Sequence, residues 1–443
     1  MEDSAVFEMV GKYTKAKIMI DNVDETTLSQ IVSFLNNPAF TNPVAIMPDC
    51  HAGKGAVIGF TMPLTTKLVP NVVGVDIGCG VYARKLPIRD IKNLEQLDIS
   101  IRAKVPFGYE IHENPIINME KDFPWEEVRK IARTFWSKFN KTFSTNVEPI
   151  SYDYDWFISK CEIIGIDAGR AVNSLGTVGG GNHFIEVGRD STGSLWLTIH
   201  SGSRNFGKKI CEYWQGTPIR KMNEKKQEKF KAGLEEIKRT HTTKAQRKLI
   251  PEAIKQLRAY LEMDNKVAKG LEYLEGEDAY GYLHDMIFTT VYAKENRRLI
   301  GKIVSENVMG LHDPQPYEIE SVHNYIDFSD FIIRKGAISA YTKFILIPLN
   351  MEDGTLICKG LANQEWNYSA PHGAGRMLSR NKAKELVDVE KAAERMRAAG
   401  IFASSIPADE TKNAYKDSNI IKEAIAPTAE IVDVIKPIIN LKD

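Results

Sequence analysis

The chain has 443 residues, of which 43% are hydrophobic and 26% are charged. This composition supports a large buried core and excludes an intrinsically disordered chain. The 58 basic and 58 acidic residues cancel, which excludes a protein that is basic over its whole surface. No apolar run reaches the roughly 18 residues of a membrane span, and the five scattered cysteines are typical of a reducing compartment. We therefore expect a cytoplasmic protein with no membrane partner.

Hydrophobic periodicity predicts a chain that mixes helices and strands. Short apolar runs that end at Pro, Gly or Asp are typical of buried strands, whereas apolar residues three and four apart predict amphipathic helices. In chain order, these patterns predict strands over 44–47 and 72–75, a helix over 125–139, a strand over 195–199, a helix over 225–238, a strand over 341–349 and a helix over 381–397. No repeat or linker divides the chain, so we expect one α+β domain over 1–443.

A basic stretch interrupts this pattern. Residues 208–269 contain 17 Lys and Arg against 8 Asp and Glu, although the whole chain has no net charge. Strand signals are few here, so we expect a helical insertion over 208–300. A charged helix is usually only solvated, but the one-sided excess favours a surface that faces a polyanion.

Two glycine-rich motifs carry residues suited to metal or phosphate chemistry. In GVDIGCG (74–80), Asp76 and Cys79 are close enough in sequence to share one or two metal ions. In GGGNHFIE (179–186), the glycines allow backbone N–H groups to approach a phosphate, and His183 follows them. Each motif alone could also be an ordinary tight turn.

Three later histidines extend this pattern. His200 ends a predicted strand in HSGSR (200–204), and His323 follows the basic stretch. His372 lies in HGAGR (372–376), where small neighbours clear space around the imidazole. The candidate metal ligands could form a one- or two-metal site that acts on phosphate, with zinc as the first choice for a Cys/His/Asp set. His372 would be a separate nucleophile or acid.

Taken together, the motifs resemble the RtcB family of RNA ligases. The matching strings occur in the family's order and over most of the chain: MPDCHAGKGAVIG (47–59), GVDIGCGV (74–81), GGGNHFIEV (179–187), HSGSR (200–204), HN (323–324) and HGAGR (372–376). The resemblance implies an RtcB-type α+β fold, in which mixed β-sheets are surrounded by helices. It also implies two Mn²⁺ ions and GTP as cofactors. The substrates would be an RNA 3′-phosphate or 2′,3′-cyclic phosphate end and a 5′-hydroxyl end, in tRNA splicing or RNA repair. An archease-like activator is a further partner that the family suggests.

The same resemblance implies roles for individual residues. Asp76, Cys79 and His183 would hold one Mn²⁺ ion, and Cys79 would bridge to a second ion. The second ion would also be bound by His200 and His323. The guanylate would be attached to the imidazole of His372 and held by Asn182, His183, Phe184, Ile185, Glu186, His323, Asn324, Pro348, Met351, Thr355, His372, Gly373, Ala374, Gly375 and Lys442.

The chain departs from the family pattern in one loop. Pro348-Leu-Asn-Met351 replaces Pro-Gly-Ser-Met, which puts the nucleotide preference in question, and Thr355 stands where a serine is expected. Two alternatives therefore stay open: a metal-dependent phosphoesterase that hydrolyses cyclic phosphates without joining ends, and an RNA-binding protein without activity. A phosphoesterase has no need of His372 or a nucleotide pocket. All expected metal and nucleophile positions are filled, which favours the ligase.

Overall fold

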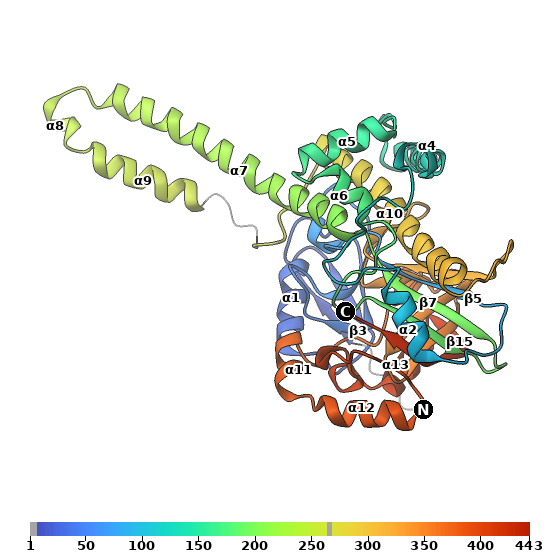
Figure 1. Cartoon of the computed structure of the whole chain (residues 1–443). Helices are drawn as coiled ribbons and strands as arrows, with labels where there is room; N and C mark the ends of the chain where they lie inside the picture. The colour runs from blue at the N-terminus through green and yellow to red at the C-terminus, as the bar shows by residue number, and fades with distance from the viewer. Residues whose placement is uncertain (1–6, 264–267) are drawn as a thin grey trace.

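The computed structural model describes residues 7–263 and 268–443, in which two large β-sheets and one small sheet are covered by helices (Figure 1). The mixed α+β class expected from the sequence is confirmed. Within these two ranges, no helix is long and apolar enough to cross a lipid bilayer.

The larger sheet is antiparallel and closes almost into a barrel. Its strands, in sheet order, are β12 (Phe344–Asn350), β13 (Gly354–Gly360), β15 (Ala429–Leu441), β6 (Phe184–Arg189), β7 (Leu195–Ser201), β5 (Gly80–Lys85) and β8 (Glu318–Val322). The two edge strands approach each other, and the backbone N–H of Leu346 in β12 donates to Ser321 Oγ in β8 at 2.8 Å. Val81, Trp196 and Ile435 are among the apolar side chains that these strands bury together.

Strand pairing in this sheet brings distant parts of the chain to one end. His200 in β7 lies opposite Val81 in β5 and Phe184 in β6. Because β5 also pairs with β8, the N–H of His323 reaches the carbonyl of Cys79 at 2.7 Å. The sheet therefore places side by side residues that are more than 100 positions apart in the sequence, such as Cys79 and His200.

The second large sheet has one parallel pair, β2 with β3, and is otherwise antiparallel. Its strands, in sheet order, are β1 (Phe7–Val10), β2 (Lys15–Ile18), β3 (Val44–His51), β4 (Ile58–Pro63), β10 (Ile332–Lys335) and β9 (Tyr325–Ile326). The small sheet pairs β11 (Ala337–Ser339) with β14 (Ser369–Pro371). Since β14 packs beside β3, the residue that follows it, His372, lies next to Asp49.

The helices surround these sheets, and one of them packs against both large sheets. In chain order they are α1 (Glu25–Leu35), α2 (Leu94–Arg102), α3 (Met119–Asp122), α4 (Trp125–Phe143), α5 (Tyr154–Ile163), α6 (Ala168–Asn173), α7 (Arg204–Thr240), α8 (Lys244–Arg247), α9 (Ile250–Met263), α10 (Glu277–Lys302), α11 (Arg380–Leu386), α12 (Val389–Ala398) and α13 (Ser418–Ala424). Through Met286 and Phe288, α10 joins the core of the six-stranded sheet. Ile300, near its end, packs in the core of the seven-stranded sheet.

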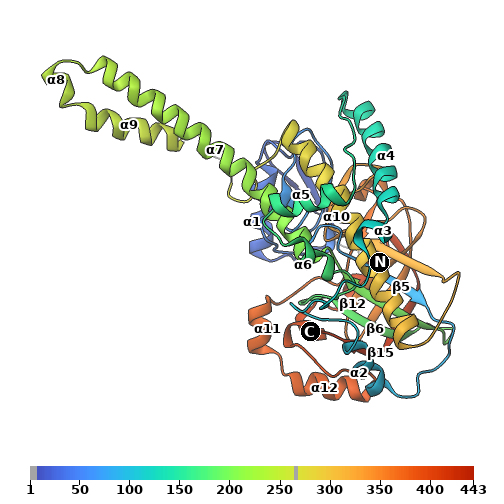
Figure 2. The same ribbon diagram turned by 45° about the horizontal axis from the view of Figure 1, so that its top comes forward.

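Helices α7 and α9 form a hairpin that projects from the body, with α8 at its tip (Figures 1 and 2). The first turns of α7 are buried in the body through Phe206, Ile210 and Trp214. The rest of the hairpin is mostly exposed, and it contains the predicted helix over 225–238. We call residues 220–263 the arm. Helix α10, although it falls within 208–300, packs in the body, and the limits of a separate insertion stay a prediction.

Most of the elements expected from hydrophobic patterns are confirmed. Strands over 44–47 and 195–199 and the helix over 125–139 are present, and the strand over 341–349 begins three residues later than expected, at Phe344. The strand over 72–75 is wrong. Pro70–Val72 forms a short 3₁₀ turn there, and Gly74 adopts φ +114°, which ends any extended run.

The single helix expected over 381–397 is also wrong, because the chain forms α11 and α12 instead. Val387, between the two helices, is extended with ψ 125°. The side chain of Asp388 then caps α12 by accepting a hydrogen bond from the N–H of Lys391 at 3.1 Å. Helix-favouring alanine, lysine and glutamate residues continue on both sides of this cap. The sequence pattern therefore gave no sign that the helix is interrupted.

Candidate metal and nucleotide site

Three buried side chains form a compact cluster of metal-ligating groups at the end of the barrel-like sheet. The ligand atoms of Cys79, His183 and His200 all lie within 4.8 Å of one another. Cys79 Sγ is 3.4 Å from His183 Nε2 and 3.3 Å from His200 Nε2. These residues come from the starts of β5 and β6 and from β7, which are neighbours in the sheet. Such a soft sulfur and two imidazoles suit a transition-metal ion.

Asp76 and His323 extend the cluster at its two ends. Asp76 Oδ2 lies 3.2 Å from His183 Nε2, and His323 Nε2 lies 3.4 Å from His200 Nε2. The five predicted metal ligands therefore form a continuous row, in which Cys79 occupies the middle. This order would allow one sulfur atom to serve two ions.

Hydrogen bonds to the backbone orient two of the imidazoles. Nδ1 of His183 bonds to the carbonyl of Val178 at 3.0 Å, and Nδ1 of His200 bonds to the carbonyl of Asn182 at 3.1 Å. A carbonyl only accepts, so each imidazole donates from Nδ1 and directs its Nε2 into the cluster. Nε2 of both rings is therefore positioned to ligate a cation.

Electrostatics in the cluster also favour a bound cation. Burial, reinforced by neighbouring histidines, lowers the pKa of His200 and His323 well below the ordinary value. Burial also raises the pKa of the Cys79 thiol well above its ordinary value, and Asp76 adds to the rise. Burial alone would raise the pKa of Asp76 as well, but hydrogen bonds from His183 and Ser203 outweigh it and hold that pKa well below its usual range. A metal ion is the group that would stabilise a thiolate here.

His372 lies beside the metal-ligand row and is held by a carboxylate. Asp49 Oδ2 accepts hydrogen bonds from His372 Nδ1 at 2.7 Å and from the His372 backbone N–H at 3.2 Å. Asp49 is fully buried, and the ring of His372 packs edge-on against that of His323 with centroids 4.7 Å apart. In the neutral imidazole, a proton on Nδ1 leaves the lone pair on Nε2. The imidazole is thus prepared to act as a nucleophile.

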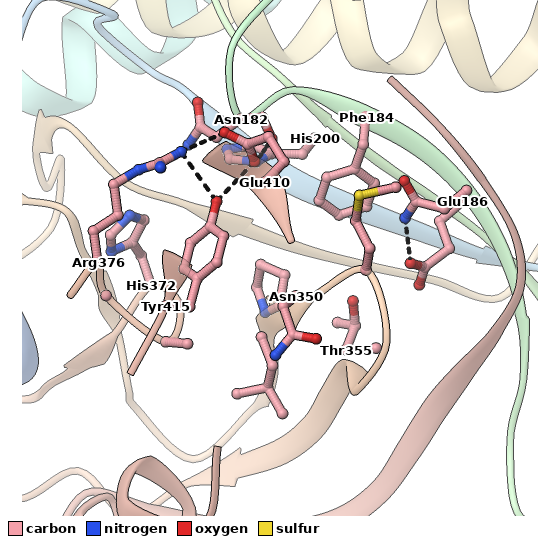
Figure 3. Close-up of a pocket in the computed structure, with 18 of the residues that line it drawn as sticks. Asn182, Phe184, Glu186, His200, Asn350, Thr355, His372, Arg376, Glu410 and Tyr415 are labelled. Carbon is pink, nitrogen blue, oxygen red and sulfur yellow. Dashed lines mark hydrogen bonds and ion pairs between the residues drawn. The ribbon is translucent and has the colours of Figure 1, made fainter. Parts of the chain in front are cut away.

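A pocket adjoins His372, and most of the residues predicted to bind a nucleotide line it (Figure 3). They include, from the predicted set, Asn182, Phe184, Glu186, Pro348, Met351, Thr355, His372, Gly373, Ala374, Gly375 and Lys442. A Cβ atom added at Gly373 would lie only 3.1 Å from the carbonyl oxygen of Pro348. Small residues beside His372 therefore leave room for a ligand.

Several polar atoms that line this pocket have no hydrogen-bond partner among the described residues. They are Glu186 Oε1, Thr355 Oγ1 and Asn440 Oδ1, all of them buried. Glu186 Oε2 accepts a hydrogen bond from Asn440 Nδ2 at 2.7 Å. Burial raises the pKa of Glu186 to about 8, although Asn440 and Lys442 oppose the rise. Buried polar atoms without partners are costly, so this wall of the pocket fits a ligand that presents N–H donors.

Four predicted nucleotide-binding residues do not line the pocket. Ile185 alternates to the opposite face of β6 from Phe184 and is fully buried in a hydrophobic core. Asn324 adopts φ +60°, donates to the carbonyl of Asp76 at 3.2 Å and accepts from the N–H of Gly336 at 2.9 Å. It therefore braces the loop that carries a metal ligand. The remaining two, His183 and His323, belong to the metal-ligand row.

A network of charged side chains on the other wall of the pocket was not predicted from the sequence. Glu410, 1% exposed, accepts hydrogen bonds from Arg376 and, at 2.7 Å, from Tyr415 (Figure 3). It also accepts from Lys442 at 2.9 Å and from Arg380 at 3.1 Å. The carboxylate thereby holds three cations in place. Neither it nor Asp49 stands in a motif with an obvious chemical role, although Asp49 falls within the string 47–59.

Comparisons with known proteins agree with the motifs. The family model for "tRNA-splicing ligase RtcB" matches residues 30–443. The RNA-splicing ligase RtcB of Escherichia coli K12 is 28% identical, and the alignment covers 95% of both chains. The tRNA-splicing ligase RtcB of Nanoarchaeum equitans is 26% identical over 95% of this chain and 91% of its own. The RNA-splicing ligase RtcB homolog 2 of Entamoeba dispar is 24% identical over 89% and 80% of the two chains.

Proposed function

Given that this chain belongs to the RtcB family of RNA-splicing ligases, we propose that it is a GTP- and manganese-dependent RNA ligase. It would join an RNA 3′-phosphate or 2′,3′-cyclic phosphate end to a 5′-hydroxyl end, in tRNA splicing or RNA repair. One observation carries the proposal: His372 lies between a row of metal ligands and a pocket with unpartnered polar atoms.

Two Mn²⁺ ions fit the donor set. Asp76, Cys79 and His183 would hold one ion, and Cys79, His200 and His323 would hold the second. The central position of the sulfur in the row supports this division. When bound, the ions would neutralise charge on phosphate oxygens during the displacement.

A guanine nucleotide fits the pocket beside His372. Glu186 would accept N–H donors of the guanine edge, because its Oε1 has no other partner in the described part of the chain. Thr355 and Asn440 add further hydrogen-bonding groups to this wall, and Lys442 lies at its end. The resemblance to the family supports the same assignment for Lys442.

The altered loop, Pro348-Leu-Asn-Met351, is held by hydrogen bonds within its own turn and lines the pocket. The strand β12 runs on through the loop to Asn350, one residue past the end expected at Leu349. Asn350 Oδ1 then accepts from the N–H groups of Glu352 and Asp353, each at 2.9 Å. Its Nδ2 donates to Asp353 Oδ2 at 2.8 Å. The side chain that replaces the family's serine is thus occupied within its own turn, so nucleotide contacts here would come from Pro348 and Met351.

The chemistry would proceed through His372. Its Nε2 would attack the α-phosphorus of GTP, forming a P–N bond as pyrophosphate leaves, while Asp49 stabilises the positive charge on the ring. An RNA 3′-phosphate oxygen would then take the guanylate, which breaks the P–N bond and forms an RNA-3′-pp-5′-G intermediate. The 5′-hydroxyl of the second RNA end would attack the 3′-phosphorus, lose its proton and displace GMP. Activation is needed because a phosphate monoester has no good leaving group.

Intact-mass measurement after incubation with GTP and manganese tests this proposal. We expect the protein to gain one covalent guanylate, and we expect the His372→Ala variant to gain none while keeping its metal content. An adduct of undiminished yield in the variant would overturn the assignment of the nucleophile. Hydrolysis of a cyclic phosphate without any adduct would instead support the phosphoesterase.

A further inference from the structure

A second cavity reaches the other end of the metal-ligand row. It is lined by Asp76 and His183, whereas the nucleotide pocket reaches His200 and His372. A bound nucleotide would occupy the first pocket, so an RNA end would approach the metal-ligand row through this second cavity.

An exposed aromatic side chain lies at this cavity. Tyr109 is 101% exposed, which makes it the most exposed of the large apolar and aromatic side chains in the described ranges. Arg170 and Lys208 line the same cavity. An aromatic ring beside basic side chains is the combination with which proteins bind single-stranded nucleic acid, since bases stack on the ring and cations meet the phosphates.

The backbone that carries Tyr109 is tied to the active-site motifs. The N–H of Gly108 donates to the carbonyl of Gly179 at 3.0 Å, and Arg204 donates to the carbonyl of Gly108 at 2.8 Å. Gly179 belongs to the glycine run that leads to His183. The position of the tyrosine is therefore coupled directly to the loops that carry metal ligands.

A tight turn keeps the ring outside. Gly108 adopts φ +59°, and the N–H of Glu110 donates to the carbonyl of Phe107 at 3.0 Å. Phe107 points inward, where it is buried in the core beneath the guanidinium of Arg102, 4.8 Å from its ring centroid. One aromatic residue thus anchors the turn, and Tyr109 is presented to solvent at the cavity.

We propose that Tyr109 is a stacking platform for an unpaired base of the RNA end that enters this cavity, and that it contributes to the choice of RNA ends. This inference rests on the proposed RNA-ligase function. A stacking role explains why so large a side chain is held on the surface by a buried anchor, and it requires no hydrogen bond that reads the sequence.

The experiment compares Tyr109→Ala and Tyr109→Phe with the wild-type protein. Affinity is measured for two oligoribonucleotides, one with a 3′-phosphate and one with a 5′-hydroxyl end, at several salt concentrations. Tyr317→Ala is the matched control, because this tyrosine is 50% exposed and lies at the far end of β8 from His323. Self-guanylylation is measured for every variant.

We expect Tyr109→Ala to weaken binding of one oligonucleotide about fivefold, the low end of the range for a base stacked on an aromatic ring. The Phe variant should bind like the wild type, and the slope of log affinity against log salt should not change, because stacking releases no counterions. The oligonucleotide that loses affinity identifies the end that Tyr109 contacts. Guanylylation and the Tyr317→Ala control should be unaffected.

Unchanged affinity of Tyr109→Ala for both oligonucleotides would overturn the proposal, and so would an equal loss in the Ala and Phe variants. A wild-type protein that takes no guanylate would refute the ligase function itself. That failure is seen in the adduct measurement and is distinct from a failure of the stacking role.

Discussion

Replacing Asp49 with asparagine tests how His372, the proposed nucleophile, is prepared. Asp49 Oδ2 is the acceptor for both the Nδ1 proton and the backbone N–H of His372. Asparagine preserves the shape of the side chain but removes its charge, and its amide N–H₂ can compete for the position facing Nδ1. If the N–H₂ faces Nδ1, the imidazole proton moves to Nε2 and the nucleophilic lone pair is lost.

The hydrogen bond between the Asp49 carboxylate and His372 sets the size of the expected loss in rate. A hydrogen bond to a charged group contributes about 1.5–3 kcal/mol, which corresponds to about a 10- to 150-fold loss in the rate of self-guanylylation. The wrong tautomer would lower the rate further, toward the roughly 10⁴-fold loss that the equivalent exchange causes in a serine-protease triad. We therefore expect Asp49→Asn to react with GTP at least tenfold more slowly than the wild type.

A time course of adduct formation by intact mass measures this rate directly. Asp190→Asn is the matched control, because this buried carboxylate accepts hydrogen bonds from Trp196 and Thr192 in the turn between β6 and β7, outside the pocket. The control should react at the wild-type rate even if it is less stable. Thermal unfolding shows whether each variant is folded. A folded Asp49→Asn protein that is guanylylated as fast as the wild type would refute the tautomer argument.

Three further perturbations test the proposed metal site, the proposed nucleotide pocket and the arm separately. Cys79→Ser should lower metal occupancy and abolish guanylylation, since a hydroxyl is a poor substitute for a bridging thiolate; wild-type metal content by elemental analysis would contradict the ligand role. Burial raises the pKa of Glu186 to about 8, so this side chain is mostly protonated at pH 7. It should lose its proton when the N–H donors of guanine bind, and GTP affinity should therefore rise as the pH approaches 8. Calorimetry in buffers of different ionisation enthalpy should detect this proton release in the wild type and not in Glu186→Gln, and equal release in both would exclude Glu186 as the acceptor. Reversing Lys225, Lys226 and Lys229 to Glu should weaken RNA binding and flatten its salt dependence without changing guanylylation, whereas parallel plots of log affinity against log salt would show that the arm does not contact the RNA backbone.

The candidate metal ligands could be identified from the sequence because each stands in a short motif with an unusual composition. Their arrangement could not be predicted. The neighbouring positions of Cys79, His200 and His323 depend on the strand order β7-β5-β8, which pairs segments far apart in the chain. Local periodicity contains no information on such pairing.

The residues that support the site were harder to predict for the same reason. Asp49 and His372 are separated by 323 positions, and only the packing of β14 beside β3 brings them together. Ile185, in contrast, was predicted to bind the nucleotide and does not line the pocket. It stands between two pocket residues in the sequence, but alternation along β6 turns it into the core.

The most direct test of the central claim is a chase of the isolated guanylylated protein. The adduct is separated from GTP and mixed with two RNA strands, one with a 3′-phosphate and one with a 5′-hydroxyl end, in the presence of manganese. We predict that the adduct disappears as the two strands are joined, with one GMP released for each junction formed. Loss of the adduct without a joined RNA, or joining that leaves the adduct intact, would contradict it.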